Sequence, residues 1–170
     1  MSNFFKATTI ICTLLISACG FHLRGNINLP AGVEPLAISG INETTTLALK
    51  LHNSLTANGI KMTDKASEAN YKIVILETKQ DRRVSTIGGR STAKEYLLLE
   101  TVVFELQNAK GVRVLGPNTI VERQVLTNDP NRVSSTNQEE KLIRQEMLNN
   151  VGGKIARQLS TFNYNTSPQQ

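Results

Sequence analysis

The chain has 170 residues, of which 39% are hydrophobic, and its formal net charge at pH 7 is +5. This length suits one folded domain with a single hydrophobic core. No apolar run approaches the roughly 20 residues that a membrane-spanning helix needs, which excludes an integral helical membrane protein.

The first 18 residues have the layout of a secretory signal peptide, with one charge at Lys6 and an apolar run over residues 10–16. Ile16-Ser17-Ala18-Cys19 resembles the lipobox of bacterial lipoproteins, in which the cysteine thiol accepts a diacylglycerol. We therefore predict a signal peptide over residues 1–18 and lipidation of Cys19. The alternative is an ordinary secretion signal followed by a chance cysteine. Gly20 resembles the second mature residue of enterobacterial lipoproteins that are sorted to the outer membrane.

Cleavage would leave 152 residues with a net charge of +4, because Lys6 is the only charged residue lost. Cys12 leaves with the signal and Cys19 becomes acylated, so no thiol remains for a disulfide. Apart from this covalent lipid, we expect no cofactor. The predicted parts are an acylated tether over residues 19–32, a folded domain over 33–162 and a polar, mobile tail over 163–170.

Residues 33–39 predict a short strand at the start of the domain. A helix follows, with Asn42 as its predicted N-cap. Its apolar stripe consists of Leu47, Leu51 and Leu55, spaced four residues apart. Asn58-Gly59 is typical of a left-handed C-cap and ends the helix. His52 lies off the stripe and should face solvent.

Two long strands are predicted to form a hairpin. The first starts as a dense apolar run over residues 71–76 and continues as a polar stretch to residue 87. The second runs over residues 95–106 with alternating apolar positions, and Gly88-Gly89-Arg90 supplies the turn. A further strand over residues 112–126 is interrupted at Gly116-Pro117-Asn118, which must bulge or bend it.

The C-terminal segment predicts a long helix that starts with a capping box at Thr136-Asn137-Gln138-Glu139. Its apolar stripe consists of Ile143, Met147, Val151, Ile155 and Leu159. Gly152-Gly153 lies within this helix, where each glycine costs roughly 1 kcal/mol relative to alanine. Either the helix kinks there, or a neighbour packs too close for a side chain, and we favour close packing.

The predicted order is strand, helix, strand, strand, strand, helix. It indicates an α+β fold, a two-layer sandwich in which two helices pack on one face of a four-stranded mixed β-sheet. The first strand–helix–strand passage implies a parallel pair, and the hairpins add antiparallel pairs.

The sequence contains no Gly-x-Ser-x-Gly, His-Glu-x-x-His or phosphate-binding P-loop motif. The two histidines, His22 and His52, lie on unrelated segments without a third ligand for a metal. We therefore expect a protein that is not an enzyme and binds no metal. Nucleic acid is an unsuitable partner, because the chain is exported and its basic hairpin lacks aromatic residues for base stacking.

The segment directly after the lipidation site reads Cys-Gly-Phe-His-Leu-Arg-Gly, residues 19–25. Together with Glu95-Tyr96, Asp129-Pro130, Asn137-Gln138-Glu139 and Glu146-Met147, it resembles the LptE (RlpB) family of lipopolysaccharide-assembly lipoproteins. This resemblance implies a protein that is lipid-anchored on the periplasmic side of the outer membrane, as a subunit of the lipopolysaccharide translocon. It would plug the LptD β-barrel in a 1:1 complex, assist assembly of that barrel, and bind lipopolysaccharide during its insertion into the outer leaflet. The alternative is a structural lipoprotein that scaffolds an envelope complex without contacting lipid cargo.

Positive charge is concentrated in the predicted hairpin, where residues 72–94 carry a net charge of +4. Because arginine pairs bidentately with phosphate, this region is a candidate site for phosphorylated lipid. The candidate lipopolysaccharide-binding residues are Arg82, Arg83, Arg90 and Lys94. The alternative is a charged strand edge that only keeps the hairpin soluble. The chain departs from some family members at Ser134-Ser135-Thr136, where they carry a basic residue.

Overall fold

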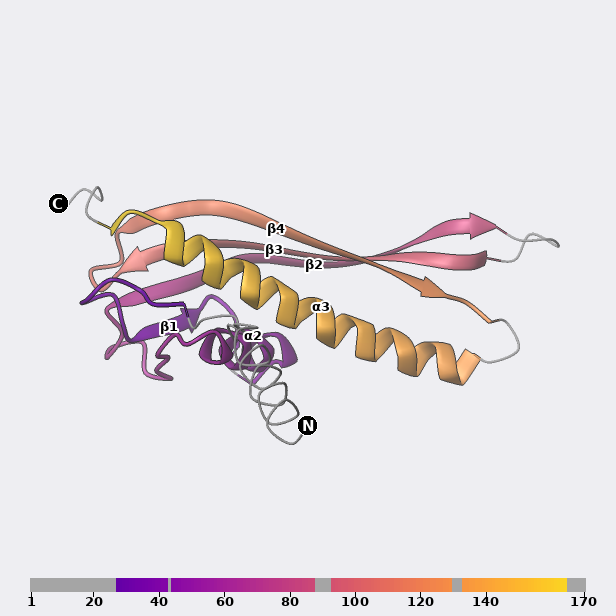
Figure 1. Cartoon of the computed structure of the whole chain (residues 1–170), viewed down its shortest axis with the longest axis horizontal. Coiled ribbons are helices and arrows are strands. Elements are labelled where there is room, and N and C mark those ends of the chain that lie inside the picture. The colour runs from indigo at the N-terminus through magenta and orange to yellow at the C-terminus, as the bar shows by residue number, and fades with distance from the viewer. Residues whose placement is uncertain (1–26, 43, 88–92, 130–132, 165–170) are drawn as a thin grey trace, which may run out of the picture.

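The computed structural model describes residues 27–42, 44–87, 93–129 and 133–164 (Figure 1). In chain order the elements are β1 (Leu36–Ser39), α2 (Thr46–Ala57), β2 (Tyr71–Ile87), β3 (Ala93–Asn108), β4 (Arg113–Thr127) and α3 (Val133–Thr161). The predicted order of elements and the α+β sandwich are confirmed. The predicted signal peptide, Cys19 and Arg90 lie outside the described residues.

The four strands form one mixed sheet in the order β1-β2-β3-β4. β1 runs parallel to β2, with Leu36 opposite Tyr71, and α2 forms the crossover between them. The β2–β3 and β3–β4 pairs are antiparallel. Because β2 and β3 continue far beyond the short β1, the sheet has a broad end with α2 and a narrow end toward the hairpin tip (Figure 1).

The main hydrophobic core lies at the broad end, where α2 and α3 cover one face of the sheet. The alternation of β3 directs Val102, Phe104 and Leu106 toward the helices, and all three are buried. The other large, fully buried members of this cluster are Leu36, Leu51, Leu55, Ile60, Ile73, Ile155 and Leu159. Tyr164, from the segment expected to form a mobile tail, packs edge-on against Tyr71 with ring centroids 5.5 Å apart.

A smaller hydrophobic cluster, which we call the narrow-end cluster, joins α3 to the far part of the sheet. Its buried members are Leu98, Leu126 and Met147, and the partly buried Tyr96 and Ile143 pack against them. α3 therefore contacts two separate apolar clusters along its 29 residues.

The start of α2 differs from the sequence prediction. Thr45 is the N-cap in place of Asn42, and its Oγ1 accepts a hydrogen bond from the Ala48 N–H at 3.2 Å. Asn42 stabilises the preceding turn, where its Oδ1 accepts from the Thr44 N–H at 3.0 Å. Both residue types supply the short oxygen-bearing side chain that a cap requires, so local sequence did not separate them. The predicted C-cap is confirmed, since Gly59 has a φ of 90°.

The start of α3 also differs, because the helix begins at Val133 and the capping box predicted at Thr136–Glu139 is wrong. Thr136 lies inside the first turns of the helix and is buried. Hydroxyl side chains run from Ser134 to Thr136, so the sequence offers several residues that resemble caps. The additional residues extend α3 toward the narrow end of the sheet (Figure 1).

Gly152 lies where α3 meets α2. A Cβ atom at Gly152 would lie 2.5 Å from both the Cβ and the Oγ of Ser54. The Ser54 hydroxyl donates a hydrogen bond to the Asn149 carbonyl at 2.8 Å, which fixes this approach. Because α3 continues through both glycines, close packing is confirmed for Gly152. Gly153 has more room, since a Cβ there would lie 3.8 Å from the Arg157 guanidinium.

The interruption predicted in β4 is present as an irregularity in the ladder. Gly116 has a φ of 94°, which favours glycine, and a Cβ there would lie 2.9 Å from the Phe104 carbonyl oxygen. The β3–β4 register shifts between Phe104 and Leu106, opposite this position. The bulge therefore divides β4 into a short initial part and a regular part.

Candidate functional site

Three of the five predicted site residues lie within the described residues, and all three are on the long hairpin. Arg82 and Arg83 lie on β2, and Lys94 lies at the start of β3. Cys19 and Arg90 lie outside the described residues.

Arg82 is engaged by two neighbours from other elements. Its guanidinium donates to the Glu140 carboxylate of α3 at 2.9 Å, and it lies over the Tyr96 ring of β3 at 3.7 Å from the centroid. An ion pair combined with a cation–π contact holds a guanidinium in one orientation. Arg82 therefore joins the hairpin to α3.

Arg83 lies in a smaller cluster on β2. Its guanidinium donates to the Asp81 carboxylate at 3.0 Å, and the Lys79 ammonium lies 3.7 Å from the same carboxylate. The hydrogen bond from Arg83, supported by the charge of Lys79, lowers the pKa of Asp81. Two cations share one carboxylate here, so this exposed cluster keeps a net positive charge.

Lys94 differs from both arginines. Its side chain is exposed, and no ion pair joins it to another described residue. Its backbone is fixed, because the Lys94 carbonyl accepts a hydrogen bond from the Asn128 N–H at 2.7 Å. Of the predicted cations that the structure describes, Lys94 is the one most available to an anion from outside.

The structure adds a partly buried ionic network that the sequence prediction missed. Arg144 of α3 pairs with Glu100 of β3 at 2.9 Å and with Glu140 at 2.8 Å. Glu140 also holds Arg82, so four charged side chains form one chain across the hairpin and the helix. The Glu140–Arg144 spacing of four residues was visible in the sequence, and Glu100 interrupts an otherwise apolar alternation.

Glu100 is 2% exposed and lies opposite Glu122 of β4 in the strand register. Burial raises the pKa of the Glu100 carboxyl, while the hydrogen bond and charge of Arg144 act in the opposite direction. Glu122 pairs with Lys154 of α3 and accepts a hydrogen bond from Asn150 at 3.2 Å. The two carboxylates form a polar row that separates the main core from the narrow-end cluster.

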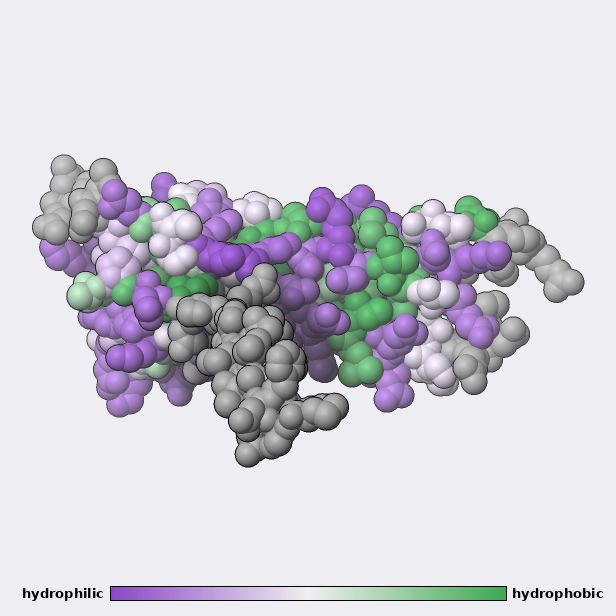
Figure 2. Space-filling view, viewed as in Figure 1, coloured by the Kyte–Doolittle hydropathy of each residue, from purple (hydrophilic) through white to green (hydrophobic). Residues whose placement is uncertain are grey.

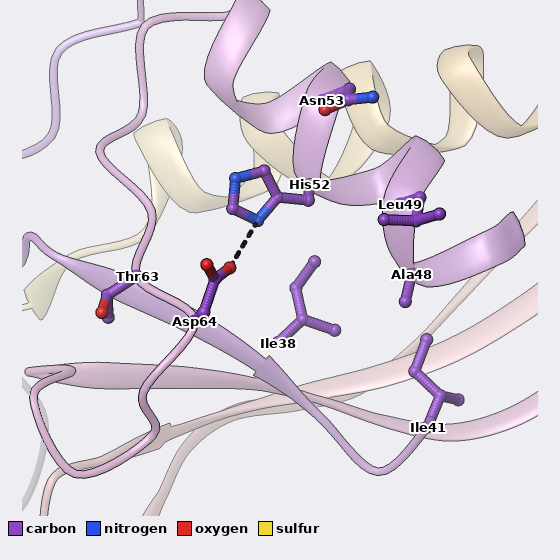
Figure 3. Close-up of a pocket in the computed structure, with 8 residues that line it drawn as sticks. All are labelled: Ile38, Ile41, Ala48, Leu49, His52, Asn53, Thr63 and Asp64. Carbon is purple, nitrogen blue, oxygen red and sulfur yellow. Dashed lines mark ion pairs between the residues drawn. The ribbon is translucent and has the colours of Figure 1, made fainter. Parts of the chain in front are cut away.

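A cavity of about 260 Å³ lies at the broad end between β1, α2 and the loop that follows α2 (Figure 3). Ile38 and Ile41 face Ala48 across it, and His52 and Asp64 lie at its rim. The His52 Nδ1 lies 3.7 Å from the Asp64 carboxylate, and the His52 side chain is 36% exposed. His52 was expected to face solvent, and it instead lines this cavity while remaining partly exposed.

Two further findings bear on the class of protein. Within the described residues, neither helix combines the length and apolarity needed to cross a membrane. Among the same residues, no three histidine, cysteine, aspartate or glutamate side chains form a group that could hold a metal ion.

Comparison with protein families gives a match over most of the chain. A family model described as "LptE: Lipopolysaccharide-assembly" matches residues 33–159. The LPS-assembly lipoprotein LptE of Pectobacterium atrosepticum is 22% identical over 154 residues, which cover 90% of this chain and 83% of that protein. The protein of the same name from Photorhabdus laumondii is 24% identical and covers 89% of this chain and 82% of its own length.

Solved structures show the same fold. Lipoprotein B from Nitrosomonas europaea has a TM-score of 0.66 at 21% identity, covering 84% of this chain and 92% of that one. A minor lipoprotein from Acinetobacter baumannii has a TM-score of 0.60 at 26% identity, covering 78% and 92%. With the family match spanning residues 33–159, this chain belongs to the LptE family of lipopolysaccharide-assembly lipoproteins.

Proposed function

We propose that this protein is the lipoprotein subunit of the outer-membrane lipopolysaccharide translocon. It would sit inside the LptD β-barrel in a 1:1 complex, assist assembly of that barrel, and contact lipopolysaccharide on its way to the outer leaflet. The observation that carries this proposal is the family match over residues 33–159. The lipobox that ends at Cys19 supports an acyl anchor that holds the domain at the periplasmic side of the membrane.

The shape and the surface of the domain support a role as a plug. Strand β2 has 17 residues, which corresponds to a length of about 55 Å at 3.3 Å per residue. The domain is narrow across this axis (Figure 1), and much of the visible surface is polar (Figure 2). The lumen of an outer-membrane barrel is itself polar, so an elongated polar domain is suited to lie inside one.

The proposed lipid contact lies on the hairpin. The candidate residues differ in whether an ion pair already engages their side chains. Glu140 holds Arg82 and balances its charge, whereas Arg83 and Lys79 share Asp81, so of these two arginines Arg83 would contribute net positive charge without leaving its partner. Lys94 is exposed and would contact phosphate directly together with Arg90. The cations act jointly, because phosphate groups of a lipid head group respond to the summed local charge.

The internal pairing of Arg82 and Arg83 also supports a second candidate function. A hairpin whose arginines mainly hold the fold together could belong to a scaffold that never contacts lipid cargo. In that case the protein would still bind the barrel. Lipid binding is therefore the property that separates the two functions.

The alanine double variant of Arg90 and Lys94 addresses lipid binding. We expect weaker binding to purified lipopolysaccharide, a smaller dependence of binding on salt, and unchanged association with the barrel, since ions screen exposed charges. Glu68→Ala together with Lys65→Ala is a matched control, because it removes an exposed ion pair away from the hairpin. Binding of the Arg90/Lys94 variant with wild-type affinity and salt slope would favour the scaffold.

The proposal as a whole is tested by affinity isolation of the full lipoprotein from detergent-solubilised outer membrane. The expected result is a stable complex with one LptD barrel per lipoprotein. A protein that is isolated alone, although it is present and acylated in that membrane, would contradict the proposed function.

A further inference from the structure

β4 is the last strand in the sheet, so one of its edges has no neighbouring strand among the described residues. One hydrogen bond determines which backbone groups face that edge. The Asn128 N–H donates to the Lys94 carbonyl at 2.7 Å, which makes these two residues a hydrogen-bonded pair at the end of the β3–β4 ladder. Such pairs alternate with non-hydrogen-bonded pairs along an antiparallel ladder.

The register is regular from the Glu95–Thr127 pair to the Val103–Thr119 pair, so the alternation can be followed along this part of β4. The residues whose N–H and C=O groups point away from β3 are Thr119, Val121, Arg123, Val125 and Thr127. A second contact agrees with this assignment, because the Lys154 ammonium reaches the Val121 carbonyl at 3.5 Å from outside the β3–β4 ladder.

Proteins usually guard such an edge, since unpaired N–H and C=O groups can pair with another strand. Here the bulge at Gly116 and the following Pro117 interrupt one end of the edge, and Lys154 covers the Val121 carbonyl. The described residues provide no comparable cover for the outward groups of Arg123 and Val125. Val125 is 53% exposed. About half of the edge is therefore open over a length that suits a short strand.

A groove runs beside the start of this edge, between β4 and α3, with a cavity volume of about 410 Å³. Lys154, Arg157 and Gln158 of α3 line it. The Arg157 guanidinium has no ion pair with a described residue. The Gln158 Oε1 is buried without a hydrogen-bond partner among the described residues, and such a group favours an added donor.

We propose that an extended segment of the barrel protein pairs with the open part of the outer edge of β4, from Arg123 to Thr127, as a fifth strand and continues beside the groove that starts at Thr119. This inference rests on the proposed function, since the barrel is the partner that it places on β4. Only another backbone offers both donors and acceptors at the spacing of the open groups. The segment carries an acidic side chain toward the groove, because Glu122 already balances Lys154 and leaves Arg157 without an ion pair to a described residue.

An inorganic or lipid phosphate is a poorer match for this site. It would pair with Arg157, yet it offers no N–H group to Gln158 and none to the outward carbonyls of β4. A peptide segment supplies both, and its side chains alternate between the groove and the opposite face of the sheet.

The test is residue-resolved amide hydrogen exchange of the full lipoprotein, alone and in its isolated complex with the barrel. Strand addition should slow exchange at Arg123 and Val125 by at least about 100-fold, because their N–H groups gain acceptors. The amides of Glu122 and Gln124, which already face β3, serve as internal controls and should change much less. A complex that forms while the amides of Arg123 and Val125 exchange as in the free protein would overturn the inference and leave the proposed function standing.

Val125→Pro gives an independent test, because it removes one outward N–H without removing a bond to β3, and proline is tolerated at such edge positions. We expect association with the barrel to weaken at least about tenfold, whereas Val125→Thr, which keeps the N–H, should bind normally. Equal binding by both variants would overturn the inference. If Val125→Pro fails to fold, as circular dichroism would reveal, the exchange measurement decides. Absence of any barrel complex with the wild-type protein would contradict both proposals.

Discussion

At the scale of single residues, two contacts determine how α3 lies against the rest of the molecule. Gly152 lets α3 approach α2 until Ser54 would touch any side chain at that position. Arg144 supplies the positive charge that Glu100 requires beneath the helix. Each contact predicts the outcome of a substitution.

Gly152→Ala should destabilise the domain, since its Cβ would lie 2.5 Å from Ser54, and overpacking costs roughly 1–3 kcal/mol. This cost exceeds the gain in helix propensity of about 1 kcal/mol that alanine brings. Gly153→Ala is the matched control and should be neutral or stabilising, because its nearest neighbour is a flexible arginine at 3.8 Å. Urea unfolding of the two variants measures the difference. Equal stability of both would show that α2 and α3 do not meet as described.

Arg144→Met removes the cation that faces the buried Glu100, and breaking a buried pair in this way costs about 3–5 kcal/mol. Burial raises the pKa of Glu100 in the folded state. The stability that this shift contributes is complete at low pH and is lost as the pH rises through the folded-state pKa. The variant should therefore lose most stability at neutral pH and less near pH 5. Free energies of unfolding measured at both pH values test this. Glu100→Gln is the control and should show a smaller change, because Arg144 keeps its ion pair with Glu140 and no charge is left without a partner.

At the scale of elements, the narrow half of α3 depends on one small apolar cluster. Met147→Ala should cost about 2–4 kcal/mol, since this side chain is fully buried against Leu98 and Leu126. Leu142→Ala, only five residues away, should change stability by no more than about 0.5 kcal/mol, because Leu142 is 61% exposed. Thermal unfolding of the isolated domain compares the two. Similar losses of stability in both variants would mean that the face of α3 that carries Leu142 is the one that packs against the sheet.

The elements themselves could largely be predicted from the sequence. The alternation along β3 and the stripe on α3 extend over many residues, so their periods are clear. The helix starts were wrong because a cap depends on one residue, and both Asn42 and Thr136 have neighbours that can cap equally well.

The contacts between elements could not be predicted in the same way. Arg82 pairs with Glu140, 58 residues later in the chain, and this pairing depends on how α3 lies over the hairpin. The sequence therefore indicated a basic surface, whereas the structure shows that part of its charge is balanced by α3. The sequence analysis also did not identify the open edge of β4, because the residues of a strand do not determine its position in the sheet order.

At the scale of the whole molecule, one elongated sheet carries α2 at its broad end and supports α3 along its length (Figure 1). The proposed lipid contact includes Lys94, which lies toward the narrow end. The proposed barrel contact lies along β4. Because lipid binding would depend on the Lys94 side chain and barrel binding on outward backbone groups of β4, the two should be separable by substitution.

The most direct measurement of the central claim is depletion of this protein in cells, followed by quantification of assembled LptD and of newly made lipopolysaccharide at the cell surface. The predicted result is loss of both, with restoration by the wild-type protein expressed from a second copy. Unchanged amounts of assembled barrel and of surface lipopolysaccharide after depletion would contradict a role in the translocon.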